Sequence, residues 1–143
     1  MDILTNILFS LHFIGLGLGA AASFGIPVVG RRIMASTPEN RPVLFPIAEG
    51  LSTLGRAGLA VLIITGPLLI WLKFGGDMAA FGGWFSVKMI CVVLLLISII
   101  ISGIQSKRAQ KGDAAAARRL PMLGIVNIVL LAAIVLSAVF AFN

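Results

Sequence analysis

Residues 84–104 read WFSVKMICVVLLLISIIISGI, and Lys88 is the only charged residue in this run. At about 1.5 Å of rise per residue, a helix of this length spans the roughly 30 Å hydrocarbon core of a bilayer. The run is apolar on all sides, whereas a helix at the surface of a soluble protein has one apolar stripe. Because hydrocarbon offers no water to backbone N–H and C=O groups, the run must bond them internally as a helix.

Three further runs of the same kind cover residues 3–29, 47–72 and 120–142. The whole chain of 143 residues is 59% hydrophobic and 11% charged, with a mean hydropathy of +1.12. The first run is too long for the apolar part of a signal peptide and has no basic segment before it, so we expect it to be retained. We therefore predict an all-α integral membrane protein, with one domain over residues 1–143 and an up-down-up-down four-helix bundle.

The formal net charge of +6 is concentrated in two of the three predicted loops. The middle loop holds only Lys73 and Asp77. By the positive-inside rule, the two basic loops are cytoplasmic and both termini lie outside, as in a bacterial inner membrane protein. The excess charge then serves orientation and contact with anionic lipid headgroups, and we expect no nucleic-acid partner. The basic loops hold Arg31, Arg32 and Arg41 with Glu39, and Lys107, Arg108, Lys111, Arg118 and Arg119 with Asp113.

Motifs of soluble enzymes and cysteine-based sites are absent from the sequence. The single cysteine, Cys91, excludes an intrachain disulfide, and we interpret it as a small packing residue. There is no HExxH, GxSxG or phosphate-binding loop, and the alternating glycines of residues 15–19 follow no strand. One histidine, one cysteine and five methionines form no ladder of soft ligands for copper transport.

Small residues are frequent in the first two spans. Gly15 and Gly19 form a GxxxG pattern, which lets two helix backbones approach closely. The same glycines could instead line a wall against which a flat cofactor lies, and the sequence does not separate the two interpretations. Pro27 and Pro67 are expected to kink or end their helices. Trp71 and Trp84 flank the outer loop, where aromatic anchors are typical (further glycines in the second span are Gly55, Gly58 and Gly66).

Ionisable residues inside a membrane span are costly and mark candidate functional sites. His12 lies about 13 Å from the outer end of its span, and Lys88 about 6 Å from the outer end of the third span. Glu49 lies near the inner interface, and Arg56 is two turns deeper on the same helix face. Asn127 reaches the depth of Arg56 from the fourth span. Neutral polar companions are Thr53, Thr65, Ser98 and Ser102.

Each ionisable residue has more than one interpretation. His12 could be an axial haem ligand, a proton-transfer group or a hydrogen-bonding residue between helices. A second histidine is missing, so bis-histidine ligation of haem within the chain is excluded. Arg56 and Glu49 could form an ion pair, or Arg56 could hold a carboxylate of a ligand entering from the cytoplasmic side. Lys88 could anchor its helix at the interface, face an anionic cofactor group or donate a proton.

Several segments resemble the HemJ-type protoporphyrinogen oxidases, small four-span membrane proteins distantly related to CopD-like membrane domains. The residues LHF at 11–13 open a glycine-rich span that ends in RR at 31–32. The residues LGR at 54–56 and ITGPLL at 64–69 are similar to the family's second helix. The residues GWFSVK at 83–88 are similar to its Gly-Trp-x-x-x-Lys third helix. The resemblance covers nearly the whole chain.

The resemblance implies b-type haem and the oxidation of protoporphyrinogen IX, with electrons passed toward quinone. It makes His12 the candidate haem ligand and Lys88 its functional partner, and these two are the candidate catalytic residues. Arg56 is a candidate contact for a porphyrin carboxylate, and we include Asn127 as a further polar residue of the cofactor site. The sequence departs from the family's pattern in residues 94–98, which hold no further histidine, and in Leu120-Pro121, where an acid is missing.

Two other classes of function stay open. The chain could be a non-catalytic helical scaffold or a subunit of a homo-oligomer, with the glycine face as the interface. It could also be a small transporter or channel, which would be oligomeric because four helices leave little internal room. Visible haem absorbance in the purified protein would separate the haem protein from both.

The orientation of the chain is testable by cysteine labelling in a variant whose Cys91 is replaced by serine. A membrane-impermeant thiol reagent added from outside should modify a cysteine placed at Asp77 and leave a cysteine placed at Lys111 unmodified, because the basic loops are retained in the cytoplasm. The opposite pattern of labelling would overturn the orientation.

Overall fold

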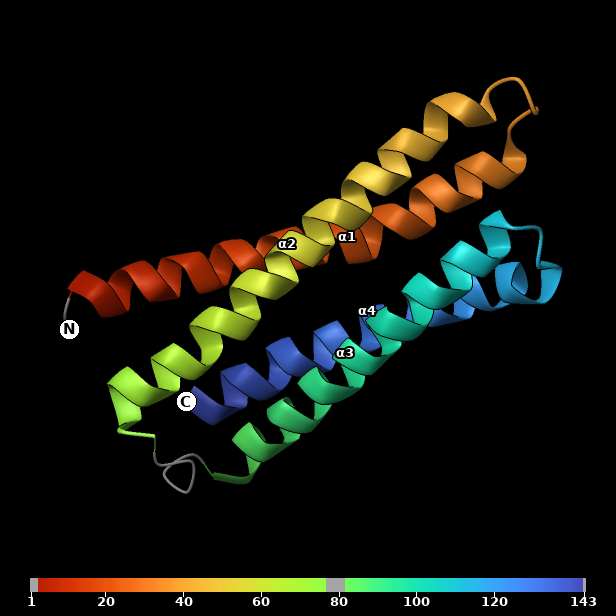
Figure 1. Ribbon diagram of the computed structural model, residues 1–143. Helices are drawn as coiled ribbons and strands as arrows, with labels where there is room; N and C mark the ends of the chain where they lie inside the picture. Colours follow the sequence, from red (N-terminus) through yellow and green to blue (C-terminus); the bar gives the residue numbers. More distant parts are fainter. Residues whose placement is uncertain (1–2, 77–81, 143) are drawn as a thin grey trace. The chain divides into compact units, whose positions relative to one another are not determined.

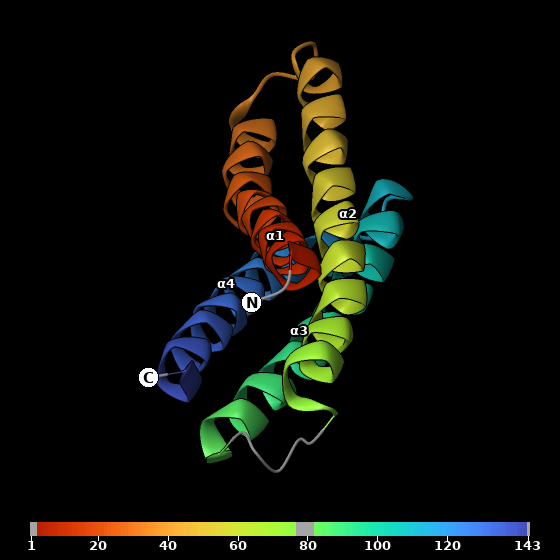
Figure 2. The same cartoon turned by 90° about the vertical axis from the view of Figure 1, so that its left-hand side faces the viewer.

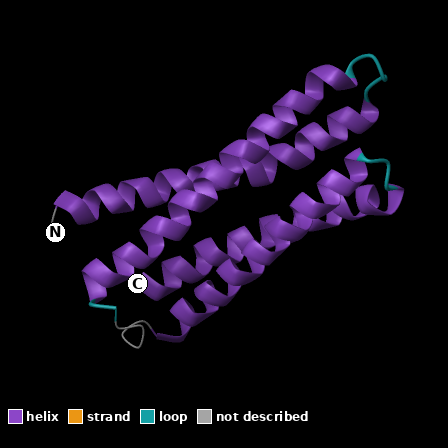
Figure 3. Cartoon of the chain, in the orientation of Figure 1, coloured by secondary structure: helices purple, strands orange, loops and turns teal. Residues whose placement is uncertain are grey.

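The computed structural model describes residues 3–76 and 82–142, and every regular element in these ranges is an α-helix (Figure 3). The helices are α1 (Ile3–Ala35), α2 (Arg41–Phe74), α3 (Gly82–Gln110) and α4 (Ala114–Phe142). All four are long and apolar enough to cross a membrane. The predicted all-α fold with four spanning helices is confirmed, and the chain is an integral membrane protein.

The chain divides into two compact units, Met1–Ala80 and Phe81–Asn143. In the first unit α1 packs against α2, and in the second α3 packs against α4. Each unit is an antiparallel pair of helices joined by a short turn at one end (Figures 1 and 2). His12 and Arg56 belong to the first unit, and Lys88 and Asn127 belong to the second.

The helices extend beyond the apolar runs that predicted them. Each predicted span lies within one helix, but α1 continues past residue 29 to Ala35, and α2 begins at Arg41 rather than at residue 47. Neither Pro27 nor Pro67 ends its helix. A proline removes one backbone hydrogen bond, and neighbouring groups in a membrane protein can compensate for this loss. Asp77, expected in the outer loop, lies outside the described residues.

Backbone contact between glycines holds α1 against α2. A Cβ atom added at Gly58 would lie 2.6 Å from the carbonyl oxygen of Gly15, and one added at Gly15 would lie 2.9 Å from the carbonyl oxygen of Gly58. One turn away, a Cβ atom at Gly55 would lie 2.6 Å from the Cβ atom of Ala22. A Cβ atom essentially never has a neighbouring heavy atom at these distances. The crossing of the two helices therefore requires the absence of these side chains.

Of the two glycines in the predicted GxxxG pattern, only Gly15 lies where a side chain would collide with α2. A Cβ atom at Gly19 would meet no atom within 4 Å, and the same holds for Gly17. The partner positions on α2, Gly55 and Gly58, are three residues apart and lie on one face of that helix. The close packing of the first two spans is therefore present, with Gly15 as the residue of α1 that requires it.

The outer surface of the helices is strongly apolar. Large hydrophobic side chains are exposed along every helix, with Ile3 80% and Met34 78% exposed on α1 and Met122 72% exposed on α4. A soluble protein rarely exposes so much contiguous apolar surface. Lipid chains are the environment that accommodates it, because they are as apolar as leucine.

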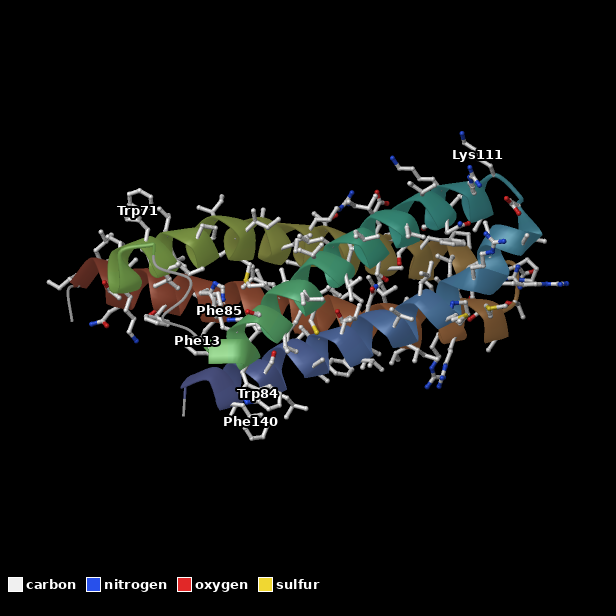
Figure 4. The ribbon with its side chains drawn as sticks, turned by 90° about the horizontal axis from the view of Figure 1, so that it is seen from below. Phe13, Trp71, Trp84, Phe85, Lys111 and Phe140 are labelled. Atoms are coloured by element: carbon white, nitrogen blue, oxygen red, sulfur yellow. The ribbon has the colours of Figure 1, made fainter. Side chains whose placement is uncertain are left out.

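Aromatic residues mark the ends of the helices nearest the α2–α3 connection. The indole of Trp84 stacks on the ring of Phe140, with centroids 5.2 Å apart, and joins the start of α3 to the end of α4 (Figure 4). Trp71 near the end of α2 is 72% exposed and points away from the helix (Figure 4). These positions fit aromatic anchors at a membrane interface, as the sequence predicted.

Replacing Gly58 with alanine tests the glycine contact. We expect a loss of roughly 1–3 kcal/mol of stability, because the new methyl group meets backbone and Cβ atoms that cannot rotate away. Thermal unfolding of the protein in detergent measures this loss. Gly17→Ala is the matched control, since its methyl group meets open space, and it should leave the melting temperature unchanged or raise it slightly. Equal melting temperatures for the two variants would contradict the contact.

Candidate functional site

The imidazole of His12 meets the hydroxyl of Thr65 across the contact between α1 and α2. His12 Nδ1 lies 2.8 Å from Thr65 Oγ1. Thr65 is only 3% exposed, whereas His12 is half-buried and makes a further contact of its own. The structural interpretation of His12, a hydrogen bond between helices, is thus confirmed for one of its two ring nitrogens.

A second hydrogen bond determines the direction of the first. Thr65 Oγ1 donates its proton to the carbonyl oxygen of Val61, one turn earlier in α2, at 2.7 Å. A hydroxyl group has one proton, so toward His12 the Thr65 oxygen acts as an acceptor. We therefore expect His12 Nδ1 to carry the ring proton. In the neutral imidazole this leaves the lone pair on Nε2, the nitrogen that can coordinate a metal or accept a proton.

The surroundings of His12 are small on one side and aromatic toward the N-terminal end of α1. A Cβ atom added at Gly66 would lie 3.7 Å from His12 Cε1, so the glycine backbone passes beside the ring. Phe9 lies one turn from His12 on α1. The Lys73 Nζ atom lies over the Phe9 ring, 5.3 Å from the ring centroid. This cation–π contact joins the second turn of α1 to the last turn of α2.

Arg56 does not share this site within the α1–α2 unit. It lies nine residues before Thr65 in the same helix, which is about 13 Å along the axis and half a turn around it. Its guanidinium Nη2 donates to Thr53 Oγ1 at 3.1 Å, and that hydroxyl donates to the carbonyl oxygen of Glu49 at 3.0 Å. The predicted polar stripe of α2 is present, but Arg56 binds Thr53 and forms no ion pair with the Glu49 carboxylate.

Asn127 lies in the second unit, where it is level with Ser98. The Trp84–Phe140 stack sets the antiparallel register, and Ser98 follows Trp84 by 14 residues while Asn127 precedes Phe140 by 13. Ser98 Oγ and Asn127 Oδ1 are buried and have no hydrogen-bond partner in residues 3–76 and 82–142. Buried polar atoms are normally paired, so this level of the α3–α4 pair has capacity for a further hydrogen bond.

Lys88 is half-buried in the second turn of α3 and makes further contacts of its own. The predicted pairing of His12 with Lys88 joins residues of different units and stays a prediction. Among the described residues, no three histidine, cysteine, aspartate or glutamate side chains gather as a metal site.

Thr65 is the hydrogen-bond partner of His12 that the sequence analysis did not predict. The sequence identified it only as a neutral polar residue, although a signal for the contact was present. His12 lies 9 residues from the outer end of the first predicted span, and Thr65 lies 7 residues from the outer end of the second. In antiparallel helices these positions are at nearly equal depth, but their faces depend on the helix crossing.

Comparison with known proteins does not place the chain in a family. No model of a known protein family matches it, and neither a characterised protein nor a solved structure does so.

The tautomer of His12 can be measured directly, because it is the only histidine. In protein labelled with ¹⁵N-histidine, we expect the neutral ring to show its proton on Nδ1. Thr65→Val removes the acceptor and should shift the ring toward the Nε2–H form, with a loss of about 1 kcal/mol of stability. Thr65→Ser keeps a hydroxyl group and should keep the Nδ1–H form. A wild-type ring protonated on Nε2 would contradict the assigned hydrogen bond.

Proposed function

We propose that this integral membrane protein binds haem or a related porphyrin, with His12 as the axial ligand. The observation that carries the proposal is the pair of hydrogen bonds from His12 Nδ1 to Thr65 and from Thr65 to Val61. Ligating histidines commonly donate their other ring N–H to an oxygen atom, which fixes the tautomer and the orientation of the ring. His12 has this arrangement already, and its donor chemistry fits haem iron.

The proposal takes its reaction class from the resemblance to the HemJ-type protoporphyrinogen oxidases. Bound b-type haem would supply one-electron redox chemistry for the oxidation of protoporphyrinogen IX to protoporphyrin IX, with quinone as the electron acceptor. The chain's own residues would bind and orient. His12 ligates, Thr65 holds the ring in its tautomer, and the glycine backbone at Gly66 leaves space beside the ring.

Lys88 would contribute charge or a proton rather than iron ligation, because an ammonium group is a poor ligand until it is deprotonated. Its place in the second turn of α3 is close to the start of that helix, whereas His12 is in the third turn of α1. Arg56 points to the other side of α2 from Thr65, so a carboxylate that it binds belongs to a different contact from the one at His12. Asn127 and Ser98 would supply hydrogen bonds in the second unit.

The packing of α1 against α2 counts against the alternative of an oligomer that uses the glycine face as its interface. Gly15, Gly55 and Gly58 are already in contact within one chain. An oligomer would need a different face, such as the open side of α1 at Gly17 and Gly19.

The absorption spectrum of the purified protein tests the proposal. In reduced-minus-oxidised spectra of the protein in detergent, with added haem if needed, we expect a Soret band. His12→Ala should abolish the band or shift it strongly, because no other imidazole can replace it. The Lys88→Ala variant should still bind most of the haem but should lose the oxidation of protoporphyrinogen IX.

Thr65→Val is the informative control. It leaves the imidazole in place and removes only the hydrogen bond that orients it, so we expect a haem affinity roughly 10- to 100-fold weaker, with a Soret band still present at saturation. A colourless wild-type protein that takes up neither haem nor porphyrin would refute the proposal. An unchanged spectrum in His12→Ala would refute the assigned ligand.

A further inference from the structure

The turn between α3 and α4 is rigid. The N–H of Asp113 donates to the carbonyl oxygen of Arg108 at 3.1 Å, and the N–H of Gly112 donates to that of Ala109 at 3.0 Å. Gly112 has φ +94°, in the region that only glycine adopts readily. This pair of bonds is the Schellman arrangement that ends a helix in a fixed geometry.

Asp113 also begins the next helix. Its Oδ1 accepts the N–H groups of Ala115 and Ala116, both at 3.0 Å, and its carbonyl oxygen accepts the N–H of Ala117 at 3.1 Å. The carboxylate is thus the N-cap of α4. One residue closes α3 and opens α4, so the last turn of one helix and the first turns of the other are held in a fixed relation.

Five cationic side chains surround this turn, and all are exposed. None forms an ion pair with a residue of the described ranges, and the one acid among them, Asp113, caps α4. The turn therefore carries a formal charge of +4, from five cations and one carboxylate. Lys111 at its tip extends away from both helices (Figure 4). We name this set the cationic turn, formed by Lys107, Arg108, Lys111, Arg118 and Arg119.

The cationic turn lies where a helix leaves the hydrocarbon. Helix α3 has 29 residues and is about 43 Å long, which exceeds the roughly 30 Å of hydrocarbon. The exposed apolar side chains of α3 continue to Ile104, which is 49% exposed, and those of α4 resume with Met122, which is 72% exposed. The cations between these two residues are therefore at the level of lipid headgroups, with apolar surface beside them for lipid chains.

Helix stability explains only part of this arrangement. Lys107 and Arg108 are in the last turn of α3, where cations interact favourably with the helix dipole. Arg118 and Arg119 follow the first turn of α4, at the end where the dipole favours anions. Their placement is favourable only if another negative charge lies against them.

The α1–α2 turn differs in these respects. Its Arg41 uses Nε to donate to the carbonyl oxygen of Ser36 at 3.3 Å. Its N-cap residue, Asn40, makes no side-chain capping bond and instead donates to Thr37 at 3.2 Å. With three cations against Glu39, this turn has the lower charge and the longer link of the two.

We propose that the cationic turn is a binding site for the headgroup of an anionic phospholipid. Guanidinium groups match phosphate oxygens in bidentate hydrogen bonds, and Arg118 and Arg119 supply two of them in sequence. The fixed turn holds these arginines and the cations of α3 in place before the lipid arrives, so little ordering opposes binding. Lipid chains then contact the exposed apolar side chains at Ile104 and Met122.

The test uses the full-length protein in a non-ionic detergent, with phosphatidylglycerol or phosphatidylcholine added. Native mass spectrometry counts bound lipids, and thermal unfolding measures the stabilisation that they give. We expect phosphatidylglycerol to bind more tightly than phosphatidylcholine and to raise the melting temperature, with a preference that falls as salt is added. Neither measurement involves haem, so the outcome is independent of the proposed haem site.

Matched variants locate the site. Arg118→Gln with Arg119→Gln should weaken phosphatidylglycerol binding roughly 25-fold, at about fivefold per cation near a membrane surface. Arg31→Gln with Arg32→Gln removes the same charge from the α1–α2 unit and should have a small effect. Arg118→Lys with Arg119→Lys keeps the charge but loses the bidentate geometry, so its binding should lie between those of the wild type and the glutamine variant.

Three results would overturn the proposal. They are equal binding of the two lipids, equal losses in the two glutamine variants, and a phosphatidylglycerol preference that salt leaves unchanged. Gel filtration and the melting temperature without lipid check that each variant is folded, and a misfolded glutamine variant is replaced in the comparison by the single change Lys111→Gln. That residue is at the tip of the turn, and its loss should weaken binding about fivefold.

Discussion

The first unit depends on the direct contact of two helix backbones at Gly15 and Gly58. Lipid provides no hydrophobic drive for helices to associate, so close packing of small residues must supply much of the attraction. The contact also sets the register of the pair. From this crossing toward the N-terminus of α1, one turn of α1 brings His12 against Thr65 at 2.8 Å, and the next turn of α1 brings Phe9 against Lys73. A larger residue at the crossing would separate all of these pairs together.

The apolar surroundings also determine what each hydroxyl group does. In a dry helix the nearest acceptor is the carbonyl oxygen one turn earlier, and Ser10, Thr65 and Ser102 donate to it. For Thr65 this has a chemical consequence, because a hydroxyl that has given its proton away can only accept from the imidazole beside it. The tautomer that we expect for His12 follows from these two local bonds.

Each of the two units has two ends that differ in the same physical terms. Near the cationic turn, one carboxylate is used to cap α4, so five cations remain for partners outside the chain. At the end of the α3–α4 unit away from this turn, Trp84 stacks on Phe140. At the end of the α1–α2 unit away from its own turn, the Lys73 ammonium lies over the Phe9 ring. A bilayer requires both kinds of end, since headgroups carry charge and the interface favours amphipathic rings.

The sequence by itself determined the four spans, because 20 or so apolar residues in succession satisfy their backbone groups in lipid only as a helix. It also determined the set of polar residues from which any site must be built, including His12, Lys88, Arg56 and Asn127. The tertiary structure decided which of them meet. It paired His12 with Thr65 and placed Arg56 half a turn away, because the helix crossing at Gly15 and Gly58 depends on atomic contacts that a hydropathy pattern does not contain. It also assigned Asp113 to a helix cap, a role that depends on the geometry of the turn.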